Sequence, residues 1–390
     1  MTRSRRKLIT FIGILLVAAT VLTFIERRRR AAEQHLGGGG KGKTEIKTSP
    51  ASPSPPTTST EATSGTEATS LPDASLAVFF SDTYANDPSV GQGDPNNIDR
   101  QLATLLGTAR ATIDGAFYEL ESERIADALI SAKQRGVKVR LVADSDYEKN
   151  PEMQKVLAAG IPVIFDGRSA LMHNKFAIID GATVWTGSFN VTDNCAFRNN
   201  NNGLMIRSEE LAENYTTEFK EMFVGNSFGA RSPSETPHTQ VKVGGATIYN
   251  YFAPEDDIAP KIVRYLSIAK KSIHFMAFNF TDGTIAEAMI EKKNSGVPVE
   301  GVIERRGAER SVMGQLQSAG IAVLKDGNKY VMHHKVIIID GEWTITGSYN
   351  FTGSAATQND ENILIIRDPA TAKKFEEEYQ RVKKMAEVPA

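Results

Sequence analysis

Two stretches of the sequence are near copies of each other: MHNKFAIIDGATVWTGSFNVT at residues 172–192 and MHHKVIIIDGEWTITGSYNFT at residues 332–352. They align without a gap, and every matched pair has the same offset along the chain as His173 and His333. The match continues upstream, where AKQRGVKVRLVAD (132–144) corresponds to KKNSGVPVEGVIE (292–304). A repeat of this length indicates a duplicated domain, because the units of solenoid proteins are far shorter.

Each copy alternates strand patterns with helical patterns. In the first copy, strands are predicted at 76–81, 111–120, 137–143, 161–165, 176–180, 183–187 and 203–207, and helices at 97–109, 121–135, 151–159 and 209–223. Apolar, β-branched strands that alternate with helices predict a central sheet covered by helices on both faces. The expected fold class is therefore α/β, with two tandem repeats at residues 76–235 and 236–390.

The same polar residues recur in both copies at the same spacing. They are His173, Lys175, Asp180, Ser188 and Asn190 in the first copy and His333, Lys335, Asp340, Ser348 and Asn350 in the second. Because residues i and i+2 of a strand share a face, each imidazole should emerge beside an ammonium group. Lysine supplies charge, serine and asparagine supply oriented donors, and histidine attacks or transfers a proton. The set suits a phosphodiester, whose developing charge spreads over several oxygens.

The doubled pattern His-x-Lys-x-x-x-x-Asp followed by Gly-Ser-x-Asn resembles the phospholipase D superfamily over most of residues 76–385. The short repeats resemble its compact branch, which includes cardiolipin hydrolases and endonucleases. The resemblance implies that the copies pack about a pseudo-twofold axis and bring both His-x-Lys pairs into one site. It also implies a covalent phosphohistidine and no need for a metal or other cofactor. By analogy, His173 is the expected nucleophile and His333 the expected general acid.

The resemblance assigns the remaining motif residues as well. Asp180 and Asp340 would support and orient the catalytic groups, which include Lys175 and Lys335. Ser188, Asn190, Ser348, Asn350 and Glu361 are the residues expected to bind the substrate. One departure concerns symmetry: the second copy has Glu361–Asn362 at the family's acidic position, whereas the first copy has Asn201–Asn202. This departure affects the symmetry of the site and the support for His173, and it leaves the core motif intact.

The other histidines and the cysteine are expected to be structural or solvated. His334 should face away from the site by strand parity, and His274 lies in an apolar strand. His35 and His238 lie in linker-like surroundings. Cys195 is the one cysteine of the chain, so an internal disulfide and a cysteine-based zinc site are excluded.

The N-terminus has the composition of a membrane anchor. Residues 8–25, LITFIGILLVAATVLTFI, form an uncharged run of 18 positions flanked by arginines, and a spanning helix needs about 17–25 apolar residues. Residues 1–30 are therefore expected to be an anchor, with a cleaved signal peptide as the alternative. Residues 31–75 read as a disordered Gly/Ser/Thr/Pro-rich linker. The sequence thus predicts a single-pass membrane protein with an extracytoplasmic catalytic body.

The distribution of charge along the chain bears on which class of substrate the protein can bind. Residues 1–75 carry 11 basic and 6 acidic side chains, which leaves 34 basic and 41 acidic ones in residues 76–390. An acidic body is unlike a protein that binds duplex DNA through many phosphates. A phospholipid substrate at a membrane is therefore the first hypothesis. A non-specific endonuclease acting on DNA or RNA is the alternative, and a non-catalytic binder of phosphate-bearing ligands is a third. Both copies lie in one chain, so an oligomer is not required.

Overall fold

A computed structural model describes residues 71–387 of the chain, apart from 83–90, 92 and 95. The first repeat contains β1 (Leu76–Phe80), α3 (Ile98–Thr108), β2 (Thr112–Phe117), α4 (Glu123–Gln134), β3 (Lys138–Ala143), α5 (Pro151–Ala158), β4 (Val163–Phe165), β5 (Lys175–Ile179), β6 (Thr183–Gly187), α6 (Asp193–Phe197), β7 (Asn202–Arg207) and α7 (Glu209–Phe223). Its strands form one sheet in the order β1-β7-β6-β5-β2-β3-β4.

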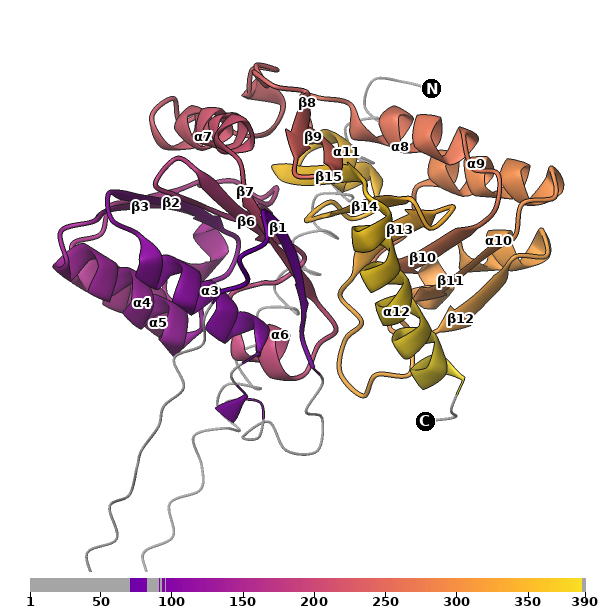
Figure 1. Ribbon diagram of the computed structural model, residues 1–390, viewed down its shortest axis with the longest axis horizontal. Helices are drawn as coiled ribbons and strands as arrows, with labels where there is room; N and C mark the ends of the chain where they lie inside the picture. The colour runs from indigo at the N-terminus through magenta and orange to yellow at the C-terminus, as the bar shows by residue number, and fades with distance from the viewer. Residues whose placement is uncertain (1–70, 83–90, 92, 95, 388–390) are drawn as a thin grey trace, which may run out of the picture. The chain divides into compact units, whose positions relative to one another are not determined.

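The second repeat contains β8 (Gln240–Val243), β9 (Ala246–Ala253), α8 (Ile258–Ser267), β10 (Ile273–Ala277), α9 (Gly283–Asn294), β11 (Val299–Ile303), α10 (Met313–Ser318), β12 (Ala322–Lys325), β13 (Lys335–Ile339), β14 (Trp343–Gly347), α11 (Gly353–Thr357), β15 (Glu361–Arg367) and α12 (Pro369–Ala386). Its sheet has the order β12-β11-β10-β13-β14-β15-β9-β8. Figure 1 shows the two sheets side by side, the first in indigo to magenta and the second in orange to yellow.

The strand directions decide where the motif residues can meet. In the first sheet, β2, β3 and β4 are parallel, whereas β5, β6, β7 and β1 pair antiparallel. The second sheet repeats this scheme with β10, β11 and β12 parallel. The carboxyl ends of the parallel strands therefore lie at the same edge as the start of β5 or β13. We call this the catalytic edge of each sheet.

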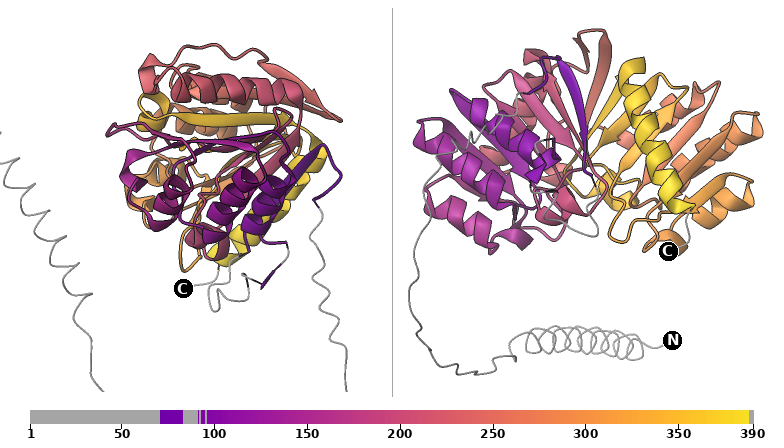
Figure 2. Two further views of the ribbon diagram at one scale, coloured as in Figure 1. Left: turned by 90° about the vertical axis from the view of Figure 1, so that its left-hand side faces the viewer. Right: turned by 60° about the horizontal axis from the view of Figure 1, so that its bottom comes forward.

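Helices cover both faces of each sheet. Helices α3, α4 and α5 lie on the outer flank of the first sheet, and α8, α9 and α10 lie on that of the second (Figures 1 and 2). The opposite faces share one apolar core with α7 and α12, in which Phe176, Tyr215, Phe252 and Phe375 are buried. This shared core joins the repeats into a single packing unit, because residues of both sheets contribute to it.

Short backbone ladders also join the repeats, and they do so reciprocally. Met172 bridges to Asp360, and Met332 bridges to Asn200. The N–H of His173 donates to the carbonyl of Asp360 at 2.9 Å, and the N–H of His333 donates to that of Asn200 at 2.9 Å. Each histidine is thus held by the backbone of the other repeat.

The predicted α/β fold with two tandem repeats is confirmed. The predicted strand at 111–120 is shorter, since β2 ends at Phe117. The hairpin β8–β9 was not expected from the sequence: β9 pairs with β15 as β1 pairs with β7, and β8 is an additional edge strand. The division into 76–235 and 236–390 stays a prediction.

The predicted localisation has to be corrected. A helix that crosses a bilayer needs about 20 consecutive apolar residues. In the part of the chain that the structure describes, no helix meets this requirement, so a single-pass membrane protein is not supported. Residues 8–25, on which that prediction rested, lie outside the described residues, as does most of the expected linker.

Candidate active site

The two catalytic edges bring the histidines and lysines of both motifs together. His173 and Lys175 lie at the start of β5, and His333 and Lys335 lie at the start of β13. Both histidines are nearly buried, with 5% and 6% of their surface exposed. The positive charges of Lys175 and Lys335 act on both imidazoles. Equivalent residues of the two repeats thus contribute to one site.

A carboxylate of the second repeat supports the histidine of the first. The Nδ1 of His173 lies 2.7 Å from an Oε2 of Glu361, which is fully buried. The hydroxyl of Ser348 donates to the same oxygen at 2.6 Å and accepts from the backbone N–H of Asn362. When Glu361 is ionised, Nδ1–H of His173 donates to its carboxylate, and the lone pair on Nε2 of His173 is free.

An amide of the first repeat supports the histidine of the second. The Nδ1 of His333 lies 2.9 Å from Oδ1 of Asn201 and 3.0 Å from the carbonyl oxygen of Ser188. Both partners are acceptors, so Nδ1 carries the proton and Nε2 is again free. The hydroxyl of Ser188 donates to Asn201 at 3.2 Å. The two supports are equivalent positions of the repeats, but one is charged and the other is neutral.

Each histidine is hydrogen-bonded by a side chain of the other repeat. This crossed support changes how the difference between Asn201 and Glu361 is interpreted. Asn201 in the first copy does not weaken the support for His173, because the partner of His173 is Glu361. The neutral partner belongs to His333 instead. Glu361 and the two serines are fully buried and hold the imidazoles or their partners, and their expected role in binding substrate stays a prediction.

Each lysine is held between its own histidine and an aromatic ring. The Nζ of Lys175 donates to the carbonyl of His173 at 2.6 Å and lies 4.7 Å from the ring centre of Tyr118. The Nζ of Lys335 donates to the carbonyl of His333 at 2.8 Å and lies 4.8 Å from that of Phe278. Tyr118 and Phe278 also stack edge-on against the two histidines. The sequence reasoning missed both rings, although they occupy equivalent positions of the two repeats and each directly follows a strand.

Burial shapes the protonation of these groups. Burial, together with the positive charges of Lys175 and Lys335, holds the pKa of both histidines well below 6.5. Burial also lowers the pKa of Lys175 to about 8, and it lowers the pKa of Lys335, on which Lys175 acts as a second cause. Burial raises the pKa of Glu361 to about 8, with Lys175 opposing the rise. The site thus presents neutral imidazoles near neutral pH.

The asparagines of the two Gly-Ser-x-Asn motifs lie at the margin of the site, with 7% and 8% of their surface exposed. The side-chain oxygens of Asn190 and Asn350 have no hydrogen-bond partner among the described residues. The Nδ2 of Asn190 donates to Glu119 at 2.9 Å, whereas the second repeat has Asn279 at the position of Glu119. Glu119 was not expected from the sequence.

Asp180 and Asp340 are not brought to the histidines. Each follows the far end of its strand, and its carboxylate accepts backbone N–H groups: those of Arg110, Ala111 and Thr112 for Asp180, and those of Lys270, Lys271 and Ser272 for Asp340. A strand rises about 3.3 Å per residue, so seven residues separate His173 from Asp180 by roughly 20 Å. The two aspartates fix a loop at the opposite edge of the sheet instead of supporting the histidines.

The remaining candidates also have structural surroundings. His334 is fully buried between Glu378, at 2.8 Å, and Asn202, at 3.0 Å, on the strand face turned away from the site. His274 is half-buried against Glu376 and Tyr379, and His238 pairs with Glu213 at the surface. Cys195 is buried. His35 lies outside the described residues.

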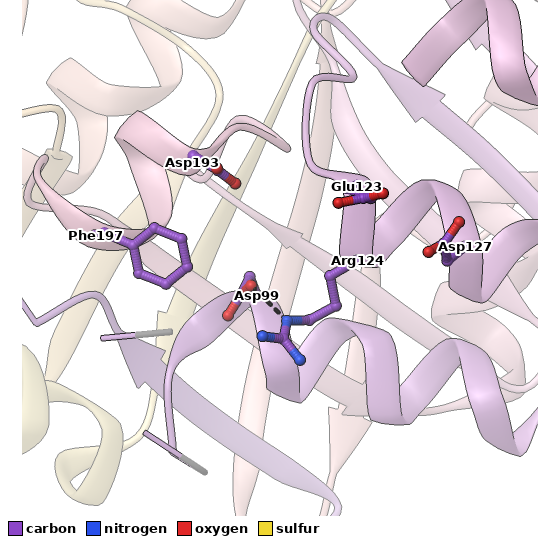
Figure 3. A pocket seen from close by; sticks show the side chains of 6 residues that line it. All are labelled: Asp99, Glu123, Arg124, Asp127, Asp193 and Phe197. Atoms are coloured by element: carbon purple, nitrogen blue, oxygen red, sulfur yellow. Dashed lines mark hydrogen bonds and ion pairs between the residues drawn. The ribbon is translucent and has the colours of Figure 1, made fainter. Parts of the chain in front are cut away.

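Two other features of the described residues lie away from the histidines. A hollow of about 450 Å³ is lined by Asp99, Glu123, Arg124, Asp127, Asp193 and Phe197 and holds none of the motif residues (Figure 3). Among the described residues, the carboxylates of Glu218, Glu221 and Glu255 lie close enough together to hold a metal ion. Glu218 accepts from Asn174, which points to the opposite strand face from His173 and Lys175.

Comparison with known proteins explains the doubled site. The family model described as "Cardiolipin synthase, PLD-like domain" matches residues 102–223 and again residues 262–383, which together make up more than half of the chain. The chain belongs to the phospholipase D-like family. The starts of the two matches, at 102 and 262, have the same offset as His173 and His333.

Individual relatives in the phospholipase D-like family align with about one repeat. The mitochondrial cardiolipin hydrolase of Chlamydomonas reinhardtii is 32% identical over 124 residues, which are 31% of this chain and 56% of that protein. The phospholipase D of Rickettsia typhi is 33% identical over 147 residues, 36% of this chain and 72% of that protein. The chain thus spans little more than half the length of the first of these. The solved phosphatidylserine synthase of Haemophilus influenzae Rd KW20 shares the fold, with a TM-score of 0.60 at 15% identity over 78% of this chain and 86% of that one.

Proposed function

We propose that the protein hydrolyses a phosphodiester bond of phospholipids through a covalent phosphohistidine on His173, without a metal ion. The observation that carries the proposal is the unequal support of the two histidines. Glu361 holds the Nδ1–H of His173, and Asn201 holds that of His333. A carboxylate stabilises the positive charge that develops on an imidazole as its Nε2 bonds to phosphorus. A neutral amide stabilises an imidazolium less, so His333 gives up a proton more readily.

In the first step, the Nε2 lone pair of His173 forms a bond to phosphorus, and the bond from phosphorus to the leaving alcohol breaks. The protonated Nε2 of His333 gives its proton to the departing oxygen. Bound phosphate makes this protonated form accessible, since a nearby anion offsets the positive charge of the two lysines and raises the pKa of His333. The ammonium groups of Lys175 and Lys335 balance the negative charge of the phosphoryl oxygens.

In the second step, neutral His333 accepts a proton from water as the water oxygen bonds to phosphorus. The nitrogen–phosphorus bond then breaks, and its electron pair returns to Nε2 of His173. The products are a phosphate monoester and the free alcohol, and both histidines regain their starting states.

Phospholipid is the substrate class best supported. The curated relatives are named as a cardiolipin hydrolase and a phospholipase D. Acidic side chains also lie near this end of the first sheet: Glu119 and Asp146 act on Tyr118, and Glu121 is close to Glu119. Asp146 and Glu121 are exposed. Such charges oppose a polyanionic strand that continues past the site on that side.

The unequal support leads to a direct test with Glu361→Gln. Loss of the carboxylate should lower kcat for phosphatidylglycerol in detergent micelles by about 10²- to 10⁴-fold, because the imidazole loses its charged partner. The assay follows alcohol release by the full-length chain in EDTA. Glu342→Gln, a matched exchange at an exposed ion pair with Arg367, should leave the rate unchanged. A Glu361→Gln variant as fast as wild type, or a wild type that works only with added metal, would contradict the proposal.

The pH dependence of kcat/KM should be bell-shaped with its maximum near pH 8. Below about pH 8 the buried acid Glu361 keeps its proton and donates it to Nδ1 of His173, which leaves the other proton on Nε2 and blocks attack. Above about pH 8 Lys175 loses its charge. Each limb should fall about tenfold per pH unit. The check is a profile from pH 5 to 10 with bis(p-nitrophenyl) phosphate. Lys175→Arg should flatten the alkaline limb, and an alkaline limb unchanged in this variant would exclude Lys175 as its source.

A further inference from the structure

Four basic side chains gather around residues 328–330, which closely precede His333 in the chain, and we call them the basic patch: Arg198, Arg305, Arg306 and Lys329. Arg306 donates to the carbonyl of Lys329 at 3.5 Å, and Arg305 donates to that of Asn328. Arg198 and Lys329 lie over the ring of Tyr330, at 5.6 and 5.9 Å. Arg306 and Lys329 are exposed.

The patch carries uncompensated positive charge. Of its members, Arg306 approaches a carboxylate, that of Glu304, at 3.9 Å. Within the described residues no ion pair is formed by Arg198, Arg305 or Lys329. Burial and the neighbouring Asp326 raise the pKa of Glu304 to about 7, which weakens it as a counter-charge. Cations that lack a strong carboxylate partner are available to an anionic ligand.

The counterpart of the patch on the other side of the site provides an internal comparison. Its equivalent positions, found with the offset between His173 and His333, are Gln358 of the second repeat for Arg198, and Ser145, Asp146 and Ser169 of the first repeat for the other three. None of these four positions is basic, and one is acidic. Arg168 lies beside Gln358, but its charge is paired with Asp166 and Asp360. The two repeats have the same strand order around these positions, so the fold does not require the basic residues. The excess of positive charge on one side of the site therefore indicates a ligand that carries a negative group on that side.

The patch lies within reach of the reacting phosphate. Lys329 and Tyr330 closely precede His333 in the chain, and Glu304, which precedes Arg305, accepts the N–H of Met332 at 2.8 Å. At the catalytic edge, Lys335 of β13 is opposite Ala277 of β10, which is opposite Ile303 of β11. Two strand spacings are about 10 Å. An arginine that follows β11 can thus meet a group a few bonds away from the phosphorus.

We infer that the basic patch is a subsite for a second phosphate, carried by the alcohol that leaves. The inference rests on the proposed function, in which His333 protonates the leaving oxygen and so places that alcohol on the side of the patch. The substrate is then a phospholipid with a second phosphate on its headgroup. A nucleic-acid strand fits less well, because it would carry phosphates past Glu119 and Asp146 on the other side.

Two lipids that differ by a single phosphate test the subsite: phosphatidylglycerol and phosphatidylglycerol phosphate, each in neutral detergent micelles with the full-length chain. Wild type should show a kcat/KM at least about tenfold higher on the phosphorylated lipid, the factor that one hydrogen bond to a charged group contributes. Arg306→Gln combined with Lys329→Gln should abolish this preference and leave the rate on phosphatidylglycerol unchanged. Both side chains are exposed, and thermal unfolding checks that the variant is folded.

The control is Lys270→Gln combined with Lys271→Gln, which removes two exposed charges of the same repeat at the opposite edge of the sheet. It should retain the preference. Equal rates of wild type on the two lipids, or equal losses in both double variants, would overturn the subsite while phosphatidylglycerol hydrolysis still supports the proposed function. No hydrolysis of either lipid by wild type would overturn both. A single-stranded oligodeoxynucleotide cleaved faster than both lipids, with the same dependence on the patch, would overturn the lipid assignment.

Discussion

His173→Ala should lower kcat for phosphatidylglycerol hydrolysis by at least about 10⁴-fold, because it removes the atom that bonds to phosphorus. The loss should persist with bis(p-nitrophenyl) phosphate, since a better leaving group does not replace a missing nucleophile. Initial rates of product release in EDTA provide the measurement. His238→Ala is the matched control, because this histidine pairs with Glu213 at the surface, outside the site.

The alternative assignment predicts a different pattern for the same variant. If His333 were the nucleophile and His173 the acid, His173→Ala would still release p-nitrophenol in a rapid first phase, because that leaving group needs no proton. A burst equivalent to one turnover in His173→Ala would therefore exclude His173 as the nucleophile.

His333→Ala should separate the two chemical steps. On phosphatidylglycerol, kcat should fall by about 10²- to 10⁴-fold, because the alkoxide leaves without a proton from a general acid. With bis(p-nitrophenyl) phosphate the first step should survive, and the second should stall for lack of a base to activate water. Stopped-flow absorbance should then show a burst of one p-nitrophenol per active site, followed by slow turnover. Equal slowing of burst and turnover would argue against separate roles for the two histidines.

Much of the fold follows from local pattern. The runs at 176–180 and 183–187 read as strands because they are apolar and β-branched, and β5 and β6 lie at nearly these positions. The hairpin β8–β9 was missed because the match between the copies does not extend to it. Strand β9 takes the place of β1 in the sheet, but Ala246–Ala253 does not lie at the offset that relates the other strands of the two copies. The constant offset between the two copies identified both His-x-Lys pairs as equivalent, because this offset can be read from the sequence alone.

The crossed support of the histidines could not be read from the sequence. It depends on two contacts between distant parts of the chain: His173 and Glu361 are separated by 188 positions, and Asn201 and His333 by 132. Such contacts exist only after the repeats have packed together. The placement of Asp180, in contrast, was accessible from the sequence. A count of residues along the strand puts it at the opposite edge from His173, where its carboxylate holds the N–H groups of Ala111 and Thr112.

The identity of the covalently modified residue tests the account most directly. The His333→Ala variant would be mixed with bis(p-nitrophenyl) phosphate, quenched in alkali during the burst, digested and analysed by mass spectrometry. The account predicts one p-nitrophenyl phosphoryl group per chain on His173, and none in His173→Ala. A group on any other residue, or a burst without a covalent adduct, would contradict it.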